Sequence, residues 1–229
     1  MKSTRVFFIH TVNSVVPAFN ELASKHLQDV KISHVVDESL IQQALEAGGL
    51  TPSIIRRLCG HVMASADAGA DVIQCTCSSM SPAVVLSRNL VSIPVLTIDE
   101  PVIRTLVRRH KRIGVIATAK STLNPSAGLV RSTAADLEFD VKVIPVFCEG
   151  AYDAMFAGDM EKHDAIVRTH LLSLIRRVDA VLLAQASMAR IATQGGIPRL
   201  VPILTSPEPA IRHLQKTIRH INDLSRRNT

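Results

Sequence analysis

The sequence predicts an α/β protein built from two similar doubly wound lobes, each with a parallel sheet, related by an internal pseudo-two-fold symmetry with a cleft between them. Two observations carry this prediction. Short apolar segments alternate with amphipathic ones along most of the 229 residues, and such alternation is typical of parallel sheets covered by helices. The second half of the chain also repeats the first at a constant offset.

The expected strands are short, apolar and rich in β-branched residues, and turn-forming segments or helices separate them. In chain order they are residues 5–10, 31–36, 71–76, 112–118, 140–146, 179–185 and 201–205. Amphipathic periodicity predicts helices at residues 17–28, 53–69 and 163–177. The stretch from Glu149 to Asp164 is predicted to be a loop that leads into a helix.

The repeat is clearest where "PVLTIDEPVIRTL" (94–106) aligns without gaps to "PILTSPEPAIRHL" (202–214), with eight of thirteen positions identical. The same offset of 108 residues pairs 5–11 with 113–119. A constant offset through several segments indicates two homologous halves. Because both repeated segments end a strand and enter a helix, we expect them to carry the chain between the lobes. The expected boundaries are 1–98 plus 207–229 for the N-terminal lobe and 99–206 for the C-terminal lobe.

Composition limits the classes of partner. The net charge is +6, but aromatic residues are only 3% and no nucleic-acid-binding motif is present. We therefore expect a solvated basic surface, which could steer an anionic small molecule, and no nucleic-acid partner. No apolar run approaches the length of a membrane helix and the N-terminus does not fit a signal peptide, so we expect a cytoplasmic protein without a membrane partner. The four cysteines form no disulfide framework.

The stretch "DVIQCTCSSM" (71–80) contains the most informative residues. Cys77 follows an apolar strand and precedes Ser78 and Ser79, which are good helix-capping residues, so backbone N–H groups should surround its thiol. A helix N-terminus stabilises a thiolate and also binds carboxylates. The repeat places Gln185 at the position equivalent to Cys77.

Cys75 lies two residues earlier, within the strand, where a free cysteine packs as a small apolar residue. A metal site with Cys59 and His61, a redox pair, and a purely structural pair of buried cysteines are the alternatives that the residues leave open. The metal and redox sites are less favoured, because neither the C-x-C spacing nor the helix positions fit them. We expect neither a metal nor a cofactor.

These residues resemble the aspartate/glutamate/hydantoin racemase superfamily along nearly the whole chain. "ADVIQCTCSS" is similar to the family's first motif, with Cys77 in the cysteine position and Ser78 and Ser79 after it. "VDAVLLAQAS" is similar to the second motif, with Gln185 where the second cysteine would stand. "RIGVIATAKST" resembles the segment that opens the second lobe. The resemblance implies Cys77 and Gln185 as catalytic positions and the following substrate-binding residues: His10, Asn13, Ser14, Ser78, Ser79, Thr118, Thr122, Ala186 and Ser187.

The resemblance implies a cofactor-independent enzyme that acts at the carbon α to the carboxylate of a small acid. In the family, two cysteines exchange a proton on opposite faces of that carbon, whereas the amide of Gln185 neither takes nor gives a proton. Cys77 would act as acid/base or nucleophile. The alternatives are a single-cysteine decarboxylase, a cis–trans isomerase of a small diacid, and a catalytically silent carboxylate-binding protein. We expect a small carboxylate as substrate; a homo-oligomer is compatible with the sequence.

Overall fold

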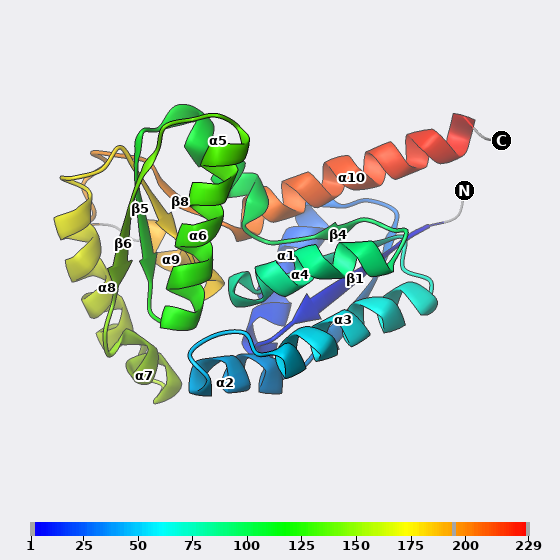
Figure 1. The fold of residues 1–229 in the computed structure, drawn as a ribbon, viewed down its shortest axis with the longest axis horizontal. Coiled ribbons are helices and arrows are strands. Elements are labelled where there is room, and N and C mark those ends of the chain that lie inside the picture. Colours follow the sequence, from blue (N-terminus) through cyan, green and yellow to red (C-terminus); the bar gives the residue numbers. More distant parts are fainter. Residues whose placement is uncertain (1–2, 194–195, 228–229) are drawn as a thin grey trace. The chain divides into compact units, whose positions relative to one another are not determined.

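The protein consists of two compact units in a computed structural model that describes residues 3–193 and 196–227 (Figure 1). Unit 1 comprises the residues up to Ile98 together with those from Pro207 onward, and unit 2 comprises Asp99–Ser206. Each unit contains one four-stranded sheet in which all the described strand pairs are parallel. The predicted α/β fold with two parallel sheets is therefore confirmed.

Unit 1 has the strand order β2-β1-β3-β4. Its elements, with short 3-10 helices labelled η, are β1 (Thr4–His10), η1 (Asn13–Val15), α1 (Val16–His26), β2 (Val30–Val36), α2 (Glu38–Glu46), α3 (Pro52–Asp67), β3 (Val72–Cys75), η2 (Ser78–Met80), α4 (Ser81–Ser87), η3 (Arg88–Leu90), β4 (Val95–Leu96) and, from the end of the chain, α10 (Pro207–Arg227).

Unit 2 has the equivalent order β6-β5-β7-β8. Its elements are α5 (Glu100–Arg109), β5 (Arg112–Ala117), α6 (Lys120–Asp136), β6 (Lys142–Phe147), α7 (Ala151–Phe156), α8 (Met160–Leu174), β7 (Ala180–Leu183), η4 (Ala186–Met188), α9 (Ala189–Thr193) and β8 (Ile203–Thr205).

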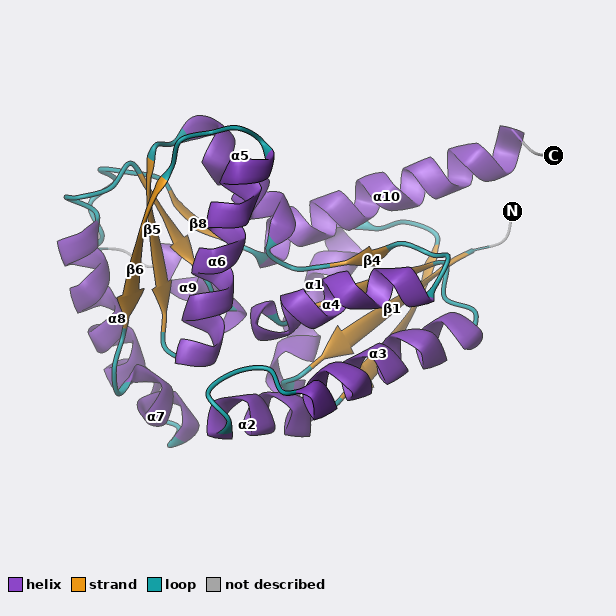
Figure 2. Ribbon diagram, viewed as in Figure 1, coloured by secondary structure: helices purple, strands orange, loops and turns teal. Residues whose placement is uncertain are grey.

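Helices cover both faces of each sheet, as the near-continuous apolar strands require (Figure 2). In unit 1 one face packs against α2, α3 and α4 through side chains such as Ile73, Leu58 and Val84. On the opposite face the Phe8 ring of β1 lies against the Phe19 ring of α1, with ring centroids 5.8 Å apart, and α10 lies beside α1.

Alternate residues of the unit 2 strands enter two separate cores. Val115 of β5 and Leu182 of β7 pack with α5 and α6, whereas their neighbours Ile116 and Leu183 pack with α8 and α9. This division follows from the period of two along a strand. In both units the strand order reverses between the first and third strands in sequence, and the carboxyl ends at that point are where doubly wound sheets bind ligands.

The ladder register corrects one detail of the sequence repeat. The third strands of the two units, β3 and β7, and the 3-10 helices after them are related by the predicted offset of 108. In the first strands, however, Val6 pairs with Val72 whereas Ile113 pairs with Ala180, so the offset there is 107. The pairing of 5–11 with 113–119 is therefore wrong by one residue, and Thr11 is equivalent to Thr118.

Three helices were not expected from the apolar pattern. The side chain of Asp37 accepts from the N–H of Ser39 and caps α2. Pro125 lies inside α6, in its second turn. Within the predicted loop from Glu149, the chain forms the short α7 before α8 begins, and Gly150 enters α7 with a positive φ of 75°.

Close packing of Gly114 against Leu174 gives a prediction for the stability of unit 2. A Cβ at Gly114 would lie 2.5 Å from Cδ2 and 2.9 Å from Cγ of Leu174. We expect Gly114→Ala to lower the free energy of unfolding by about 1–3 kcal/mol because the new methyl group overlaps the buried Leu174 side chain and the core must shift. Gly128→Ala in α6 is the matched control, since nothing lies within 4 Å of its Cβ, and it should raise stability by about 0.5–1 kcal/mol. Urea unfolding of both variants checks this; equal stabilities would contradict it.

Candidate functional site

Cys77 lies at the carboxyl edge of the unit 1 sheet, where the strand order reverses. β3 ends at Cys75, and Cys77 is the N-cap of η2 in an extended conformation (φ −122°, ψ 116°). Thr11 is the first residue after the end of β1. Thr76 is tied to β1 because its N–H donates to the carbonyl of Ile9 at 3.0 Å. These connections place the Cys77 thiol beside the first residue after β1.

Burial and hydrogen bonding act on the Cys77 thiol in opposite directions. Burial raises its pKa, and this effect is the largest. Hydrogen bonds with the Thr11 hydroxyl, the N–H groups of Ser79 and Met80, and the Ser79 hydroxyl lower the pKa. The predicted donors around the sulfur are therefore present, but the group is expected to be a neutral thiol at neutral pH in the ligand-free protein.

The other three cysteines occupy different environments. Cys59, Cys75 and Cys148 are buried, whereas Cys77 is partly exposed. Cys75 belongs to the apolar core beneath α2, α3 and α4, as expected for a free cysteine within the strand. His61 bonds through Nε2 to Asp37 Oδ2 at 2.8 Å, and among the described residues no group of three or more metal-ligating side chains could hold an ion.

The loop after β1 carries further candidates. Asn13 and Ser14 are exposed in η1, and the N–H of Asn13 donates to Oε1 of Glu38 at 3.0 Å. Ser78 and Ser79 are buried in η2. These residues share the carboxyl edge of the unit 1 sheet with Cys77.

His10 differs from the other candidates because its ring is fully buried and both ring nitrogens have partners. Nδ1 lies 2.8 Å from Thr76 Oγ1 and Nε2 lies 2.9 Å from His34 Nδ1. Burial, and secondarily the neighbouring His34, lowers the pKa of His10 to about 4. The ring is therefore neutral at pH 7 and reaches Cys77 only through Thr76.

Unit 2 builds the equivalent position with an amide in place of a thiol. Gln185 is the N-cap of η4 with nearly the same backbone conformation as Cys77 (φ −127°, ψ 139°). Its Oε1 accepts from the N–H of Thr118 at 2.6 Å and from the Thr118 hydroxyl at 3.0 Å. This bonding fixes the orientation of the amide and uses two donors of Thr118.

The remaining unit 2 candidates lie at the carboxyl edge of the unit 2 sheet. Thr122 is buried in the first turn of α6, and Ala186 is partly exposed at the start of η4. The side chain of Ser187 lies outside the part of the structure that is described. The neighbouring Ser121 was not predicted: its buried hydroxyl has no partner among the described atoms, which makes it a further donor candidate at the start of α6.

Thr11 was also missed by the sequence prediction. It is buried, contacts the Cys77 thiol and occupies the position equivalent to Thr118, which contacts Gln185. Thr11 and Thr118 are 107 residues apart, so an alignment of the two halves at the fixed offset of 108 does not pair them.

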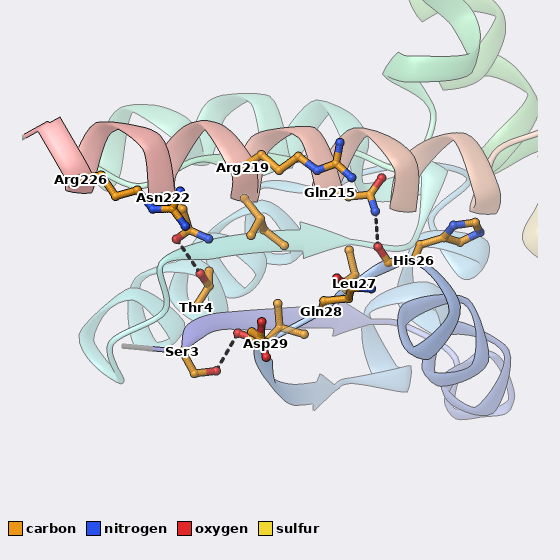
Figure 3. A pocket seen from close by; sticks show the side chains of 12 residues that line it. Ser3, Thr4, His26, Leu27, Gln28, Asp29, Gln215, Arg219, Asn222 and Arg226 are labelled. Carbon is orange, nitrogen blue, oxygen red and sulfur yellow. Dashed lines mark hydrogen bonds between the residues drawn. The ribbon is translucent and has the colours of Figure 1, made fainter. Parts of the chain in front are cut away.

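A separate cavity of about 380 Å³ lies at the opposite edge of the unit 1 sheet (Figure 3). Arg219, Asn222 and Arg226 of α10 face Thr4 and Asp29 near the starts of β1 and β2 across it. The Thr4 hydroxyl donates to Oδ1 of Asn222 at 3.1 Å. Because the strands begin here, this cavity is distinct from the candidate site around Cys77.

Sequence comparison decides the family. The family model for Asp/Glu/hydantoin racemase matches residues 7–214. The chain belongs to this family. A search of curated proteins found no significant match.

Solved racemases share the fold of this racemase-family chain at low sequence identity. Glutamate racemase isoform RacE1 from Bacillus anthracis is 16% identical with a TM-score of 0.72, covering 96% of this chain and 83% of that one. Aspartate racemase from Picrophilus torridus is 15% identical with a TM-score of 0.69, covering 93% and 94%. Allantoin racemase from Klebsiella pneumoniae is 15% identical with a TM-score of 0.65, covering 95% and 88%. Within the described ranges, no helix of this family member is long and apolar enough to cross a membrane.

Proposed function

We propose that this protein is a cofactor-independent enzyme that acts at the carbon α to the carboxylate of a small acid, with Cys77 as its acid/base or nucleophile. One observation carries the proposal. Where the strand order of unit 1 reverses, Cys77 is partly exposed, and hydroxyl and N–H donors contact its sulfur. Membership of the racemase family supports this class of chemistry.

Cys77 would transfer a proton to or from the substrate carbon as a neutral thiol and a thiolate in turn. Removal of a weakly acidic α-proton needs a poised base and donors for the negative charge that develops on the carboxylate. The N–H groups of Ser79 and Met80 and the Thr11 hydroxyl stabilise the thiolate after the proton moves to carbon or before it is taken. A bound carboxylate would use further donors at the carboxyl edge of the unit 1 sheet, among them Asn13 and Ser14.

The amide of Gln185 favours proton transfer by Cys77 alone. Racemisation by two bases needs a second proton-transfer group, and an amide cannot serve as one near neutral pH. Gln185 Oε1 is occupied by Thr118, so its NH₂ group is the part available to donate to a carboxylate or enolate oxygen. This observation supports a second candidate function: decarboxylation or cis–trans isomerisation of a small diacid, with Cys77 alone moving the proton or adding to the double bond.

The test is incubation of the pure protein in deuterated water with aspartate, glutamate, hydantoins, malonates and maleate. We expect deuterium at the α-carbon, or loss of CO₂ or conversion to fumarate, with at least one of them. Cys75→Ala is the matched control, because that residue is buried in the core, and it should retain the reaction. No turnover with any of them, combined with saturable carboxylate binding, would instead identify a silent binding protein.

Restoring a thiol at position 185 should change the stereochemical outcome. In Gln185→Cys a second acid/base group replaces the amide, so we expect exchange to be accompanied by racemisation of a chiral substrate that the wild type exchanges with retention. Chiral chromatography of the recovered substrate measures this. Gln185→Ala is the control, because it removes the amide without adding a proton-transfer group. Racemisation by both variants alike would contradict the proposed role of position 185.

A further inference from the structure

The rings of His10 and His34 lie at the centre of a hydrogen-bonded chain in unit 1. His10 Nδ1 is 2.8 Å from Thr76 Oγ1, and His10 Nε2 is 2.9 Å from His34 Nδ1. His34 Nε2 is 3.0 Å from Oδ1 of Asn20. The chain therefore runs from Asn20 on the exposed side of α1, across β2 and β1, to Thr76, which directly precedes Cys77.

With the amide oxygen of Asn20 toward His34, one arrangement of hydrogens satisfies the contacts from Asn20 to Thr76. The amide oxygen of Asn20 only accepts, so His34 Nε2 carries the hydrogen and Nδ1 of the neutral ring is bare. That bare nitrogen accepts from the Nε2–H of His10. His10 Nδ1 is then bare in turn and accepts from the hydroxyl of Thr76. These tautomers are assigned from the hydrogen-bonding pattern.

The surroundings of both rings favour the neutral form. Phe8 stacks with each ring, at centroid distances of 5.8 Å for His10 and 5.6 Å for His34, and Phe19 meets the edge of His10. Burial lowers the pKa of both histidines. The described contacts of the rings, from β1, β2, α1 and the segment after β3, include no carboxylate.

At the other end of the hydrogen-bonded chain, Thr76 is the residue that directly precedes Cys77, and it is held in place. The N–H of Thr76 donates to the carbonyl of Ile9 at 3.0 Å, and the Thr76 hydroxyl lies within 2.8 Å of His10 Nδ1 and 3.3 Å of the same carbonyl. Both the backbone and the side chain of Thr76 are thus held. Because Cys77 is the next residue, this anchor sets where η2 begins and how its N–H groups meet the sulfur.

We propose that His34 is a positioning residue for Cys77, which acts through His10 and Thr76 and releases the strand end when the ring gains a proton. A protonated His34 carries a hydrogen on Nδ1, which then opposes the Nε2–H of His10, so this arrangement of hydrogens along the chain is lost. The inference rests on the proposed catalytic role of Cys77, but the state of the chain is measurable without any substrate.

Nitrogen-15 NMR of the wild-type protein tests the arrangement directly. At neutral pH we expect both histidines as Nε2–H tautomers. On titration from about pH 8 to about pH 4, the backbone amide resonances of Thr76 and Cys77 should move with the same midpoint as the His34 ring. Amides that do not follow this ring, or a different pair of tautomers, would overturn the proposal.

Three substitutions of His34 separate the effect of its hydrogen bonds from the effect of its side-chain volume. In His34→Asn an amide oxygen lies near the former position of Nδ1 and the side chain does not titrate. The longer side chain of His34→Gln can replace only the contact with Asn20. His34→Phe keeps the ring stacking but neither hydrogen bond. We expect His34→Asn to abolish the pH-dependent movement that follows His34 and to keep Cys77 alkylation within about twofold of wild type. His34→Gln and His34→Phe should slow alkylation at least about threefold, because the N–H donors lose their alignment with the sulfur.

His26→Asn is the matched control, since His26 lies in the same unit but is not part of the hydrogen-bonded chain; its Nε2 is 3.7 Å from Oε1 of Glu208. It should leave the amide titration and the alkylation rate of Cys77 unchanged. Equal alkylation in all three His34 variants would overturn the positioning role. The proposed function fails separately: a protein without turnover whose Thr76 and Cys77 amides still follow His34 loses the enzymatic assignment and keeps the anchor.

Discussion

Cys77→Ser is expected to lower the rate of α-carbon exchange or of the corresponding decarboxylation by about 10²–10⁴-fold, the usual contribution of a positioned acid/base group. Serine preserves the size of the side chain and the contacts with Thr11, Ser79 and Met80, but its hydroxyl is far less acidic than a thiol. The loss should appear in kcat rather than in substrate binding, because the donors around the site remain.

The measurement is deuterium incorporation under saturating substrate, compared with Cys75→Ala and Cys148→Ala, which alter buried cysteines. Thermal unfolding of the same samples shows whether the fold is kept. A Cys77→Ser protein that retains wild-type exchange would remove Cys77 from the mechanism, whatever the behaviour of the controls.

Acidification should destabilise unit 1 through His10 before most carboxylates are protonated. The folded-state pKa of His10 is about 4, below that of a histidine in an unfolded chain, so the folded state disfavours the charged ring. The stabilisation is fully present above about pH 6.5 and is lost as the pH falls toward 4, by about 3 kcal/mol in total. The direction follows because the unfolded chain binds the proton more readily.

Urea unfolding between about pH 7 and pH 4, with hydrogen exchange of the β1 amides to assign the change to unit 1, measures this slope. His10→Asn keeps an acceptor near the position of Nδ1 and cannot titrate, so its stability should vary less over this range. His220→Asn, at an exposed position of α10, is the control and should keep the wild-type slope. Identical slopes for wild type and His10→Asn would show that His10 does not set the acid sensitivity.

Asp37 acts at lower pH, because hydrogen bonds from Ser39, His61 and Arg57 hold its pKa at about 2 against the opposing effect of burial.

Local pattern was enough to predict both parallel sheets, because buried strand segments such as Phe8–Ile9 and Ala180–Leu183 are apolar throughout. The helices α2 and α7 escaped prediction because they are short and their first turns depend on a cap or on a positive φ. Cys77 and Gln185 could be singled out from the repeat alone, since each is the second residue after one of two equivalent apolar strands.

By itself, the sequence determined the fold class, the equivalence of Cys77 and Gln185, and the separation of Cys77 from Cys75. The tertiary structure decided which groups these residues meet: Thr11 beside the thiol, Thr118 bound to the amide, and the buried His10–His34 pair that ends at Thr76. Those partners come from strands distant in sequence, and a shift of one residue in the register decides which of them face each other. Ladder register depends on the hydrophobic pattern of each strand against its neighbours, and an alignment of the two halves at one fixed offset does not capture a shift of one residue.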